Sequence, residues 1–290
     1  MKDIHWNSNQ FHILRFYIRN VLIKCLFSAA FLFLYFDISQ PLTVRAAETD
    51  RMERPYHLIQ TVSEQDLYEG LLALGFLECP VLEEENVKLA YVNAGKCVVG
   101  IHMEDAYGSG IIFQMTPERI VIASNKHVLD YWEDETGYVQ FYQGYIAEGE
   151  LIGVSGQYDV GFLAIDNEQL GYQTLQSLLY ASCSLATYQK LQVQDEIFCV
   201  GGNRDEVIYY SGNVEILQVY IEELEGYMMQ ADGMAVPGMS GGGTFDAKGS
   251  LIGMLTGADG WGKTASIPLP VLLEAYEEVL DSDLESNTPQ

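Results

Sequence analysis

Basic residues are scarce in this sequence. Its 290 residues include 15 Lys and Arg against 41 Asp and Glu, which gives a formal net charge of −26. An acidic protein repels phosphate groups, so we expect neither nucleic acid nor an anionic membrane surface as a partner. The acidic residues lack the D-x-D-x-D-G spacing of a calcium loop, and His and Cys form no zinc-like pair. We therefore predict no metal and no other cofactor.

Long apolar runs are also missing. The longest run, Cys25 to Phe36, has about 12 residues, fewer than the roughly 20 that a membrane-spanning helix needs. It follows a basic segment and precedes the small residues Ala46 and Ala47, so residues 1–47 are predicted to be a signal peptide. A signal anchor is the alternative, because neighbouring apolar residues could extend the run. Both interpretations place the remainder outside the cytoplasm, extracellular or in the cell envelope, and the second adds a membrane tether.

Cysteine is too rare to predict a disulfide framework. Beyond the signal the chain has Cys79, Cys97, Cys183 and Cys199, which would allow three pairings if oxidised. Cys97 and Cys199 lie in apolar, strand-like stretches, where buried free thiols are an equally good interpretation. The sequence leaves the disulfide state open.

Short β-prone runs fill the chain from about Lys96 onward. They are rich in Val, Ile, Phe and Tyr, and Gly, Asp or Asn separates them at intervals of about 8 to 12 residues. This pattern is typical of an all-β barrel or sandwich. The runs are Cys97 to His102, Gly110 to Gln114, Arg119 to Ser124, Tyr138 to Tyr145, Val160 to Ile165, Glu196 to Val200, Val207 to Ser211, Val214 to Val219, Gly226 to Met229, Gly242 to Phe245 and Ser250 to Thr256.

Helical spacing flanks the β region. Residues 48–95 are predicted to be a linker and a helical lead, with one short helix from Glu64 to Phe76. Residues 96–280 form the main domain, which closes with a helix from Val271 to Leu280. Residues 281–290 are predicted to be an acidic tail.

Ser240 lies in the glycine-rich string Val236-Pro237-Gly238-Met239-Ser240-Gly241-Gly242. A nucleophilic hydroxyl needs a tight turn, with backbone N–H groups aimed at the oxygen of the attacked carbonyl. Glycine permits such a turn and keeps the approach open. We assign the two oxyanion donors to the N–H groups of Gly238 and Ser240. An ordinary turn is the alternative for this string taken alone.

A serine hydroxyl becomes a good nucleophile only when a base takes its proton, so the hypothesis requires a histidine. The chain beyond the signal offers His57, His102 and His127. His57 lies in the charged lead and His102 ends a β-prone run. His127 follows the apolar run that ends at Ser124, where a rigid strand meets a turn. We predict that His127 is the general base.

The histidine in turn needs a carboxylate that fixes its tautomer and stabilises its protonated form. Asp159 leads directly into the apolar run Val160 to Ile165, whereas most other acidic residues have polar neighbours. Asp130, three residues after His127, is the nearest rival. We predict that Asp159 orients His127.

The order His127, Asp159, Ser240 with these flanks resembles the trypsin-like serine peptidases, in particular the bacterial HtrA/DegP-type protease domain. The resemblance extends over most of the chain from about Lys96 to Leu280. Its motifs are Gly108-Ser109-Gly110-Ile111-Ile112, Ser124-Asn125-Lys126-His127-Val128, Asp159-Val160-Gly161-Phe162-Leu163, Asp195 to Gly201, Ser211 to Val214 and Asp232 to Gly253.

The resemblance implies an all-β fold of two six-stranded antiparallel β-barrels, with a C-terminal helix, a short helical N-terminal lead and the triad in the cleft between the barrels. It also implies an exported serine endopeptidase that cleaves peptide or protein substrates through an acyl-enzyme. Met234 takes the position at the base of the primary specificity pocket, which predicts cleavage after small or medium apolar residues (P1). Core packing is the alternative for Met234. Leu255, Thr256 and Gly257 match the strand that pairs with the substrate backbone.

Three departures from the family pattern stand out. Met239 replaces the usual Asn or Asp before the serine, and Gly243 replaces the usual proline after the glycines. Neither position supplies a reacting group, so we expect an active site with a more mobile loop. A regulatory PDZ domain is not expected, because only about ten residues follow the last predicted helix.

Two other interpretations stay open. One is a catalytically inactive protein-binding module of the same fold at the cell surface. The other is a structural or adhesion β-sandwich, which leaves the coincidence of His127, Asp159 and Ser240 unexplained. The oligomeric state cannot be read from the sequence.

Overall fold

The computed structural model describes residues 62–104, 106–130, 132, 137–202 and 206–286, and residues 281–286 by their backbone alone. The predicted signal at residues 1–47 and the first part of the linker, residues 48–61, lie outside the described residues. None of the helices in the described ranges combines the length and apolar character needed to span a bilayer.

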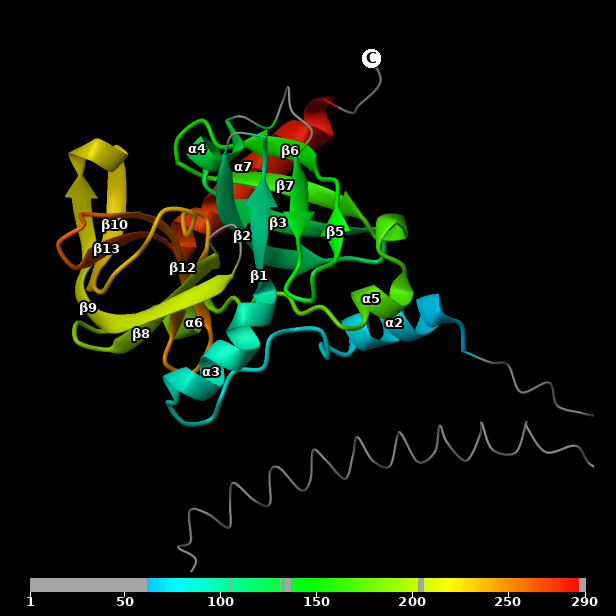
Figure 1. Ribbon diagram of the computed structural model, residues 1–290, viewed down its shortest axis with the longest axis horizontal. Helices are drawn as coiled ribbons and strands as arrows, with labels where there is room; N and C mark the ends of the chain where they lie inside the picture. The colour runs from blue at the N-terminus through cyan, green and yellow to red at the C-terminus, as the bar shows by residue number, and fades with distance from the viewer. Residues whose placement is uncertain (1–61, 105, 131, 133–136, 203–205, 287–290) are drawn as a thin grey trace, which may run out of the picture. The chain divides into compact units, whose positions relative to one another are not determined.

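Most of the described chain is β-structure, with short helices at the connections and one long helix near the end (Figure 1). The helices are α2 (Glu64–Ala73), α3 (Val87–Ala94), α4 (Lys126–Leu129), α5 (Tyr172–Leu175), α6 (Leu185–Tyr188) and α7 (Leu269–Ser286), with 3₁₀ turns η1 (Gly95–Cys97), η2 (Asn167–Gln169) and η3 (Glu222–Leu224). The strands are β1 (Val98–His102), β2 (Tyr107–Met115), β3 (Arg119–Ser124), β4 (Tyr138–Gln140), β5 (Ile146–Ala147), β6 (Glu150–Val154), β7 (Gly161–Asp166), β8 (Glu196–Gly202), β9 (Val207–Ile221), β10 (Gly226–Asp232), β11 (Gly243–Asp246), β12 (Leu251–Ala258) and β13 (Lys263–Pro268).

The strands form two antiparallel sheets. The first has the order β5-β4-β1-β2-β3-β7-β6 and is green in Figure 1. The second closes on itself as a six-stranded barrel in the order β10-β13-β12-β11-β8-β9, coloured yellow to orange. This confirms the predicted all-β fold of two antiparallel units, the second of which is a closed barrel of six strands. The first sheet has seven strands rather than six. Of the predicted run Tyr138 to Tyr145 only Tyr138–Gln140 is a strand (β4), and after a turn at Gly144 the chain returns as β5, which pairs with β4.

Strand β3 shows how the apolar sequence sets up two cores. Successive side chains of a strand point to opposite faces, and every residue from Ile120 to Ala123 is fully buried. Ile120 and Ile122 pack inside the first sheet, whereas Val121 and Ala123 pack in the core shared with α7 and the second sheet. Burial on both faces makes β3 a rigid support for the residues that follow it.

The lead before β1 is folded against both sheets. Helix α2 begins with a capping box between Ser63 and Asp66, and Tyr68 on the helix is fully buried. Helix α3, which the sequence did not predict, packs on β8 and stacks Tyr91 on Tyr209 at 4.0 Å between ring centroids. Residues 62–95 are therefore part of the folded unit.

Two sequence predictions need correction. The runs Val207 to Ser211 and Val214 to Val219 are one continuous strand, β9. Gly212 does not end the strand. Glycine is needed at this position because a Cβ would lie 1.7 Å from the backbone oxygen of Asp232, which approaches the strand closely here. The C-terminal helix is also longer than predicted, since α7 begins at Leu269 and continues through Ser286 into the predicted acidic tail.

The four cysteines in the described residues are free thiols. Cys79, Cys97 and Cys199 are buried and Cys183 is half-buried. Burial raises the pKa of Cys199 to about 11 and that of Cys183 to about 12. These thiols therefore pack as small apolar groups.

The two sheets meet at a seam between β2 and the segment that joins β10 to β11. The N–H of Ser109 donates to the carbonyl of Ser240 at 2.8 Å, and the N–H of Gly241 donates to Leu255 at 2.9 Å. Gly241 has φ +85°, and a Cβ there would lie 2.1 Å from the carbonyl oxygen of Ser109 and 2.4 Å from Ser124 Oγ. Only glycine fits at this point of the seam.

A matched pair of glycine substitutions tests the seam. Gly144 has nearly the same φ as Gly241, +84°, but nothing lies within 4 Å of its added Cβ. Gly144→Ala should cost only the strain of the left-handed backbone, about 1–2 kcal/mol. Gly241→Ala should lower the free energy of unfolding in urea by a further ~1–3 kcal/mol, because the methyl group overlaps β2 and β3. Equal losses for the two variants would contradict the close contact.

Candidate active site

His127 lies where the rigid strand β3 ends. Asn125 is the N-cap of α4, and Val128 and Leu129 are buried anchors of that short helix. The His127 side chain is left 49% exposed, directed away from the core. His102, by contrast, is 7% exposed and stacks on Tyr138 at 4.7 Å, so its surroundings are those of a structural histidine.

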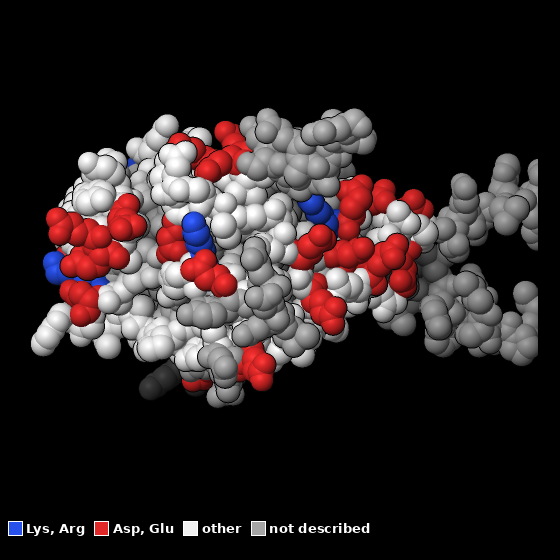
Figure 2. All heavy atoms as spheres, turned by 90° about the horizontal axis from the view of Figure 1, so that it is seen from above, with Lys and Arg blue, Asp and Glu red and all other residues white. Residues whose placement is uncertain are grey.

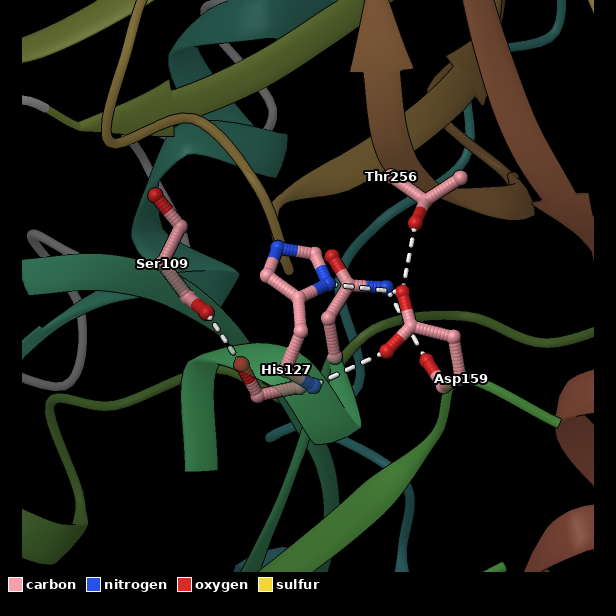
Figure 3. A network of polar contacts seen from close by, with 6 residues as sticks. Ser109, His127, Asp159 and Thr256 are labelled. Carbon is pink, nitrogen blue, oxygen red and sulfur yellow. Dashed lines mark hydrogen bonds and ion pairs between the residues drawn. The ribbon is translucent and has the colours of Figure 1, made fainter. Parts of the chain in front are cut away.

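Asp159 lies two residues before β7 and faces His127 (Figure 3). Its Oδ2 lies 2.8 Å from His127 Nδ1 and accepts a hydrogen bond from Thr256 Oγ1 at 2.7 Å. Its Oδ1 accepts the backbone N–H of His127 at 2.9 Å. One carboxylate therefore fixes both the ring and the backbone of His127. The rival carboxyl, Asp130, is exposed.

These contacts shift both pKa values. The hydrogen bond to Asp159 raises the pKa of His127 above its ordinary value of 6.5, against the opposing effect of burial. Burial raises the pKa of Asp159, but the hydrogen bonds from His127 and Thr256 outweigh it, and the net pKa is lowered. At neutral pH Asp159 is therefore a carboxylate, and the Nδ1–H tautomer of the neutral imidazole is the one that can donate to it.

The loop that carries Asp159 is held on two sides. Asn125 Nδ2 donates to the Asp159 carbonyl at 3.0 Å. On the other side, Glu278 of α7 accepts the hydroxyl of Ser155 at 2.6 Å and the N–H of Gly156 at 3.0 Å. These contacts fix the loop, and with it the position of Asp159, against the rest of the fold.

Ser240 lies on the other side of the seam. Its carbonyl is bound to Ser109 of β2, and the next residue is bound to Leu255, the neighbour of Thr256. Since Thr256 contacts Asp159, the Ser240 turn and the His127–Asp159 pair are both bound to neighbouring residues of β12. Among the hydrogen bonds of the described residues none joins Ser240 Oγ to the His127 ring, and such bonds are often long before substrate binds.

The two backbone groups predicted as oxyanion donors lie on this turn. Gly238 has φ +97°, a conformation that favours glycine. In the described part of the chain, neither the Gly238 N–H nor the Ser240 N–H donates to a protein acceptor. The carbonyl of Pro237 accepts Tyr107 Oη at 3.4 Å, and the carbonyl of Met239 accepts the Gly242 N–H at 2.9 Å.

The predicted substrate-binding residues have mixed environments. Met234 is 59% exposed, which excludes core packing. Leu255 is buried and its backbone is bound to the turn after Ser240. Gly257 pairs with Ala265 of β13. Thr256 lies between them at an irregularity in β12, with its hydroxyl on Asp159.

Sequence reasoning missed three residues that support the site. Thr256 was assigned to substrate pairing, and Asn125 and Ser109 were given no role. Each carries a polar side chain within or beside an apolar strand, and each is at most 4% exposed. A hydroxyl or amide buried in such a strand needs a hydrogen-bond partner, and that requirement is the signal that could have singled them out.

Acidic side chains gather in several clusters over the face shown in Figure 2, and Lys and Arg are few there.

Within the described ranges, no three His, Cys, Asp or Glu side chains are grouped as metal ligands would be.

The profile of the trypsin-like peptidase domain family matches residues 108–254, just over half of the 290 residues. The chain belongs to the trypsin-like peptidase family. The match spans His127, Asp159 and Ser240, and it confirms the resemblance drawn from the motifs.

A solved structure supports the fold of this trypsin-like peptidase domain. It is the HtrA-type protease AlgW, in a serine-to-alanine variant, with a tripeptide, and it aligns with a TM-score of 0.57 at 20% sequence identity. The alignment covers 67% of this chain and 64% of that protease, so the chain spans less than two thirds of its length. No curated protein sequence matches the chain.

The histidine pKa tests the central pair without any assay of activity. Asp159→Asn removes the charge and the acceptor that raise the pKa of His127, so that pKa should fall clearly. The pKa is measured by NMR titration of the ring Cε1–H, which is assigned by its loss in His127→Gln.

Asp130→Asn is the matched control. Asp130 raises the pKa of His127 only through its charge, and it is exposed to solvent, so its removal should lower that pKa only slightly. A fall of the same size in both variants would mean that the 2.8 Å contact with Asp159 does not form.

Proposed function

We propose that this chain is a serine endopeptidase. Ser240 Oγ attacks the carbonyl carbon of a peptide bond while His127 Nε2 takes its proton, and His127 then gives that proton to the departing amine. A water molecule then gives a proton to His127 and attacks the acyl carbonyl, and the ester bond breaks as His127 returns the proton to Ser240 Oγ. The observation that carries the proposal is the 2.8 Å contact between His127 Nδ1 and Asp159 Oδ2 beside the Ser240 turn.

The negative oxygen of the tetrahedral intermediate would bind the N–H groups of Gly238 and Ser240. A trans peptide points its N–H opposite to its carbonyl, and the described residues contain no cis peptide bond. Because Pro237 and Met239 have their carbonyls tied to protein donors, the following N–H groups face the other way, free to receive the oxyanion.

Peptide substrates would add as a strand to the end of β12. In the described sheet, β11 pairs with β12 only as far as Met254, whereas β13 continues along Gly257 and Ala258. One edge of β12 beyond Leu255 therefore has no described strand beside it. Strand addition at such an edge gives main-chain hydrogen bonds that position the bond to be cut.

A fluorophosphonate probe tests the nucleophile. The probe reacts with an activated serine, so the folded chain should be labelled at Ser240, located by mass spectrometry, and Ser240→Ala should abolish the labelling. His127→Ala should slow labelling by about 10³-fold or more, because the hydroxyl loses its base.

The same experiment separates the enzyme from the catalytically inactive binding module that the sequence left open. The inactive binding module would be supported if a folded wild-type chain, checked for processing of its N-terminal region, is never labelled.

The location outside the cytoplasm, which rests on residues 1–47, is tested by a probe that does not cross membranes. Intact producing cells should then show labelling at Ser240, and labelling only after lysis would contradict export.

We also propose that the enzyme prefers small or medium apolar P1 residues, since Met234 supplies no charge for Lys or Arg. In a panel of peptides that differ only at P1, Ala and Val should give higher kcat/KM than Lys. Met234→Asp should shift the ratio toward Lys by about 10-fold or more through charge attraction.

Val193→Asp is the control for the added charge. Val193 lies in the loop before β8, and its exposed fraction of 51% is similar to the 59% of Met234. It should leave the P1 ratio unchanged. A Met234→Asp variant with the wild-type preference would show that Met234 does not contact the P1 side chain.

A further inference from the structure

The side chain of Ser109 makes contacts that the triad does not use. Ser109 is fully buried on β2. Its Oγ accepts the N–H of Gly202 at 2.8 Å and lies 2.7 Å from the carbonyl oxygen of Gly238. Because an N–H can only donate, the hydroxyl proton of Ser109 is directed to Gly238.

The backbone of Ser109 is equally engaged. Its N–H donates to Ser240, and its carbonyl accepts the hydroxyl of Ser124 at 2.7 Å. One residue of the first sheet therefore holds the turn at two points, on both sides of Met239, and is itself fixed by β3 and β8.

Tyr107 holds the same turn two residues earlier on β2, on the same face of the strand. Its hydroxyl donates to Pro237 at 3.4 Å, and a Cβ on Gly238 would lie 2.2 Å from its ring. The ring thus lies directly against the backbone of Gly238.

The turn is anchored from the second barrel as well. Met239 is fully buried and packs with Cys199 and Leu255. The methionine that departs from the family pattern is an apolar anchor, which argues against the more mobile loop expected from the sequence.

We propose that Ser109 is a positioning residue for the oxyanion hole. Gly238 can rotate its two flanking peptides at little steric cost, so the turn could also point a carbonyl, rather than the Gly238 N–H, into the site. The Ser109 hydroxyl binds the Gly238 carbonyl and Tyr107 binds the Pro237 carbonyl, and together they keep the Gly238 N–H on the substrate side. The hole is then preformed before substrate binds. This inference rests on the proposed peptidase function.

The substitution Ser109→Ala tests the proposal by kinetics and by structure. The variant lacks the bond to Gly238, so kcat should fall by about 10- to 100-fold, short of the loss of a whole oxyanion donor, with KM nearly unchanged. The pKa of His127 should not move, because Ser109 does not contact the His127–Asp159 pair. A crystal structure of the variant should show the Pro237–Gly238 or Gly238–Met239 peptide rotated.

The control is Asn167→Ala. Asn167 is 4% exposed and donates to the carbonyls of Thr116 and Pro117, each at 2.9 Å. It follows the end of β7 that is remote from Asp159, so the variant should lose stability without losing kcat. A matching drop in kcat would mean that Ser109→Ala acts only through stability, and it would overturn the proposal.

The outcomes distinguish this inference from the proposed function. A wild-type chain that cleaves peptides, with wild-type kcat in Ser109→Ala, would overturn the inference alone. A wild-type chain without peptidase activity would contradict the proposed function. The crystal structure then decides the inference separately, because unrotated peptides in Ser109→Ala overturn it and rotated peptides support it.

Discussion

The carboxylate of Asp159 is the constraint on which the site depends. It accepts the ring and the backbone N–H of His127 from the first sheet and the hydroxyl of Thr256 from the second. Three donors on one charge offset the cost of its partial burial and lower its pKa. The same contacts fix the angle of the imidazole and join the two sheets beside Ser240. The interaction that orients the base therefore also holds the two sheets together.

Strand β2 holds the turn that carries Ser240. Through Ser109 and Tyr107 it carries hydrogen bonds across the seam to the turn before and at Ser240. Glycines at 238 and 241 allow the turn to approach β2 more closely than any side chain would permit. A preorganised set of backbone donors needs no rearrangement as charge develops, which is the main source of catalysis at such sites. In the proposed peptidase, the rigidity of both sheets holds these donors in place.

The sequence predicted the parts of this site that depend on local pattern. His127 and Asp159 were predicted from their places at the ends of apolar strands, and the structure brings their side chains to 2.8 Å. Ser240, chosen for its glycine-rich turn, stays a prediction as the nucleophile. The spacing of the β-prone runs indicated an all-β barrel or sandwich, and the resemblance to the trypsin-like peptidases supplied the two-barrel arrangement. The role of Thr256 was not predicted, because its partner is 97 residues away along the chain.

The remaining errors have the same physical origin. Gly212 was taken as a break between strands, although its role is to admit the backbone of Asp232. Met239 was expected to loosen the turn, whereas its side chain is fully buried against Cys199 and Leu255. Neither outcome is encoded within a few residues, since both depend on which segment packs opposite. Local periodicity cannot supply that information.

The central claim is that Ser240, His127 and the two backbone donors act on one carbonyl group. A crystal structure of the chain with a peptide boronic acid tests it most directly, because the boron atom takes the tetrahedral geometry of the intermediate. The account predicts a bond from Ser240 Oγ to boron, one boron oxygen within hydrogen-bond distance of the Gly238 and Ser240 N–H groups, and His127 Nε2 facing the adduct. An adduct whose oxygen points to solvent, with His127 turned away from it, would contradict the account.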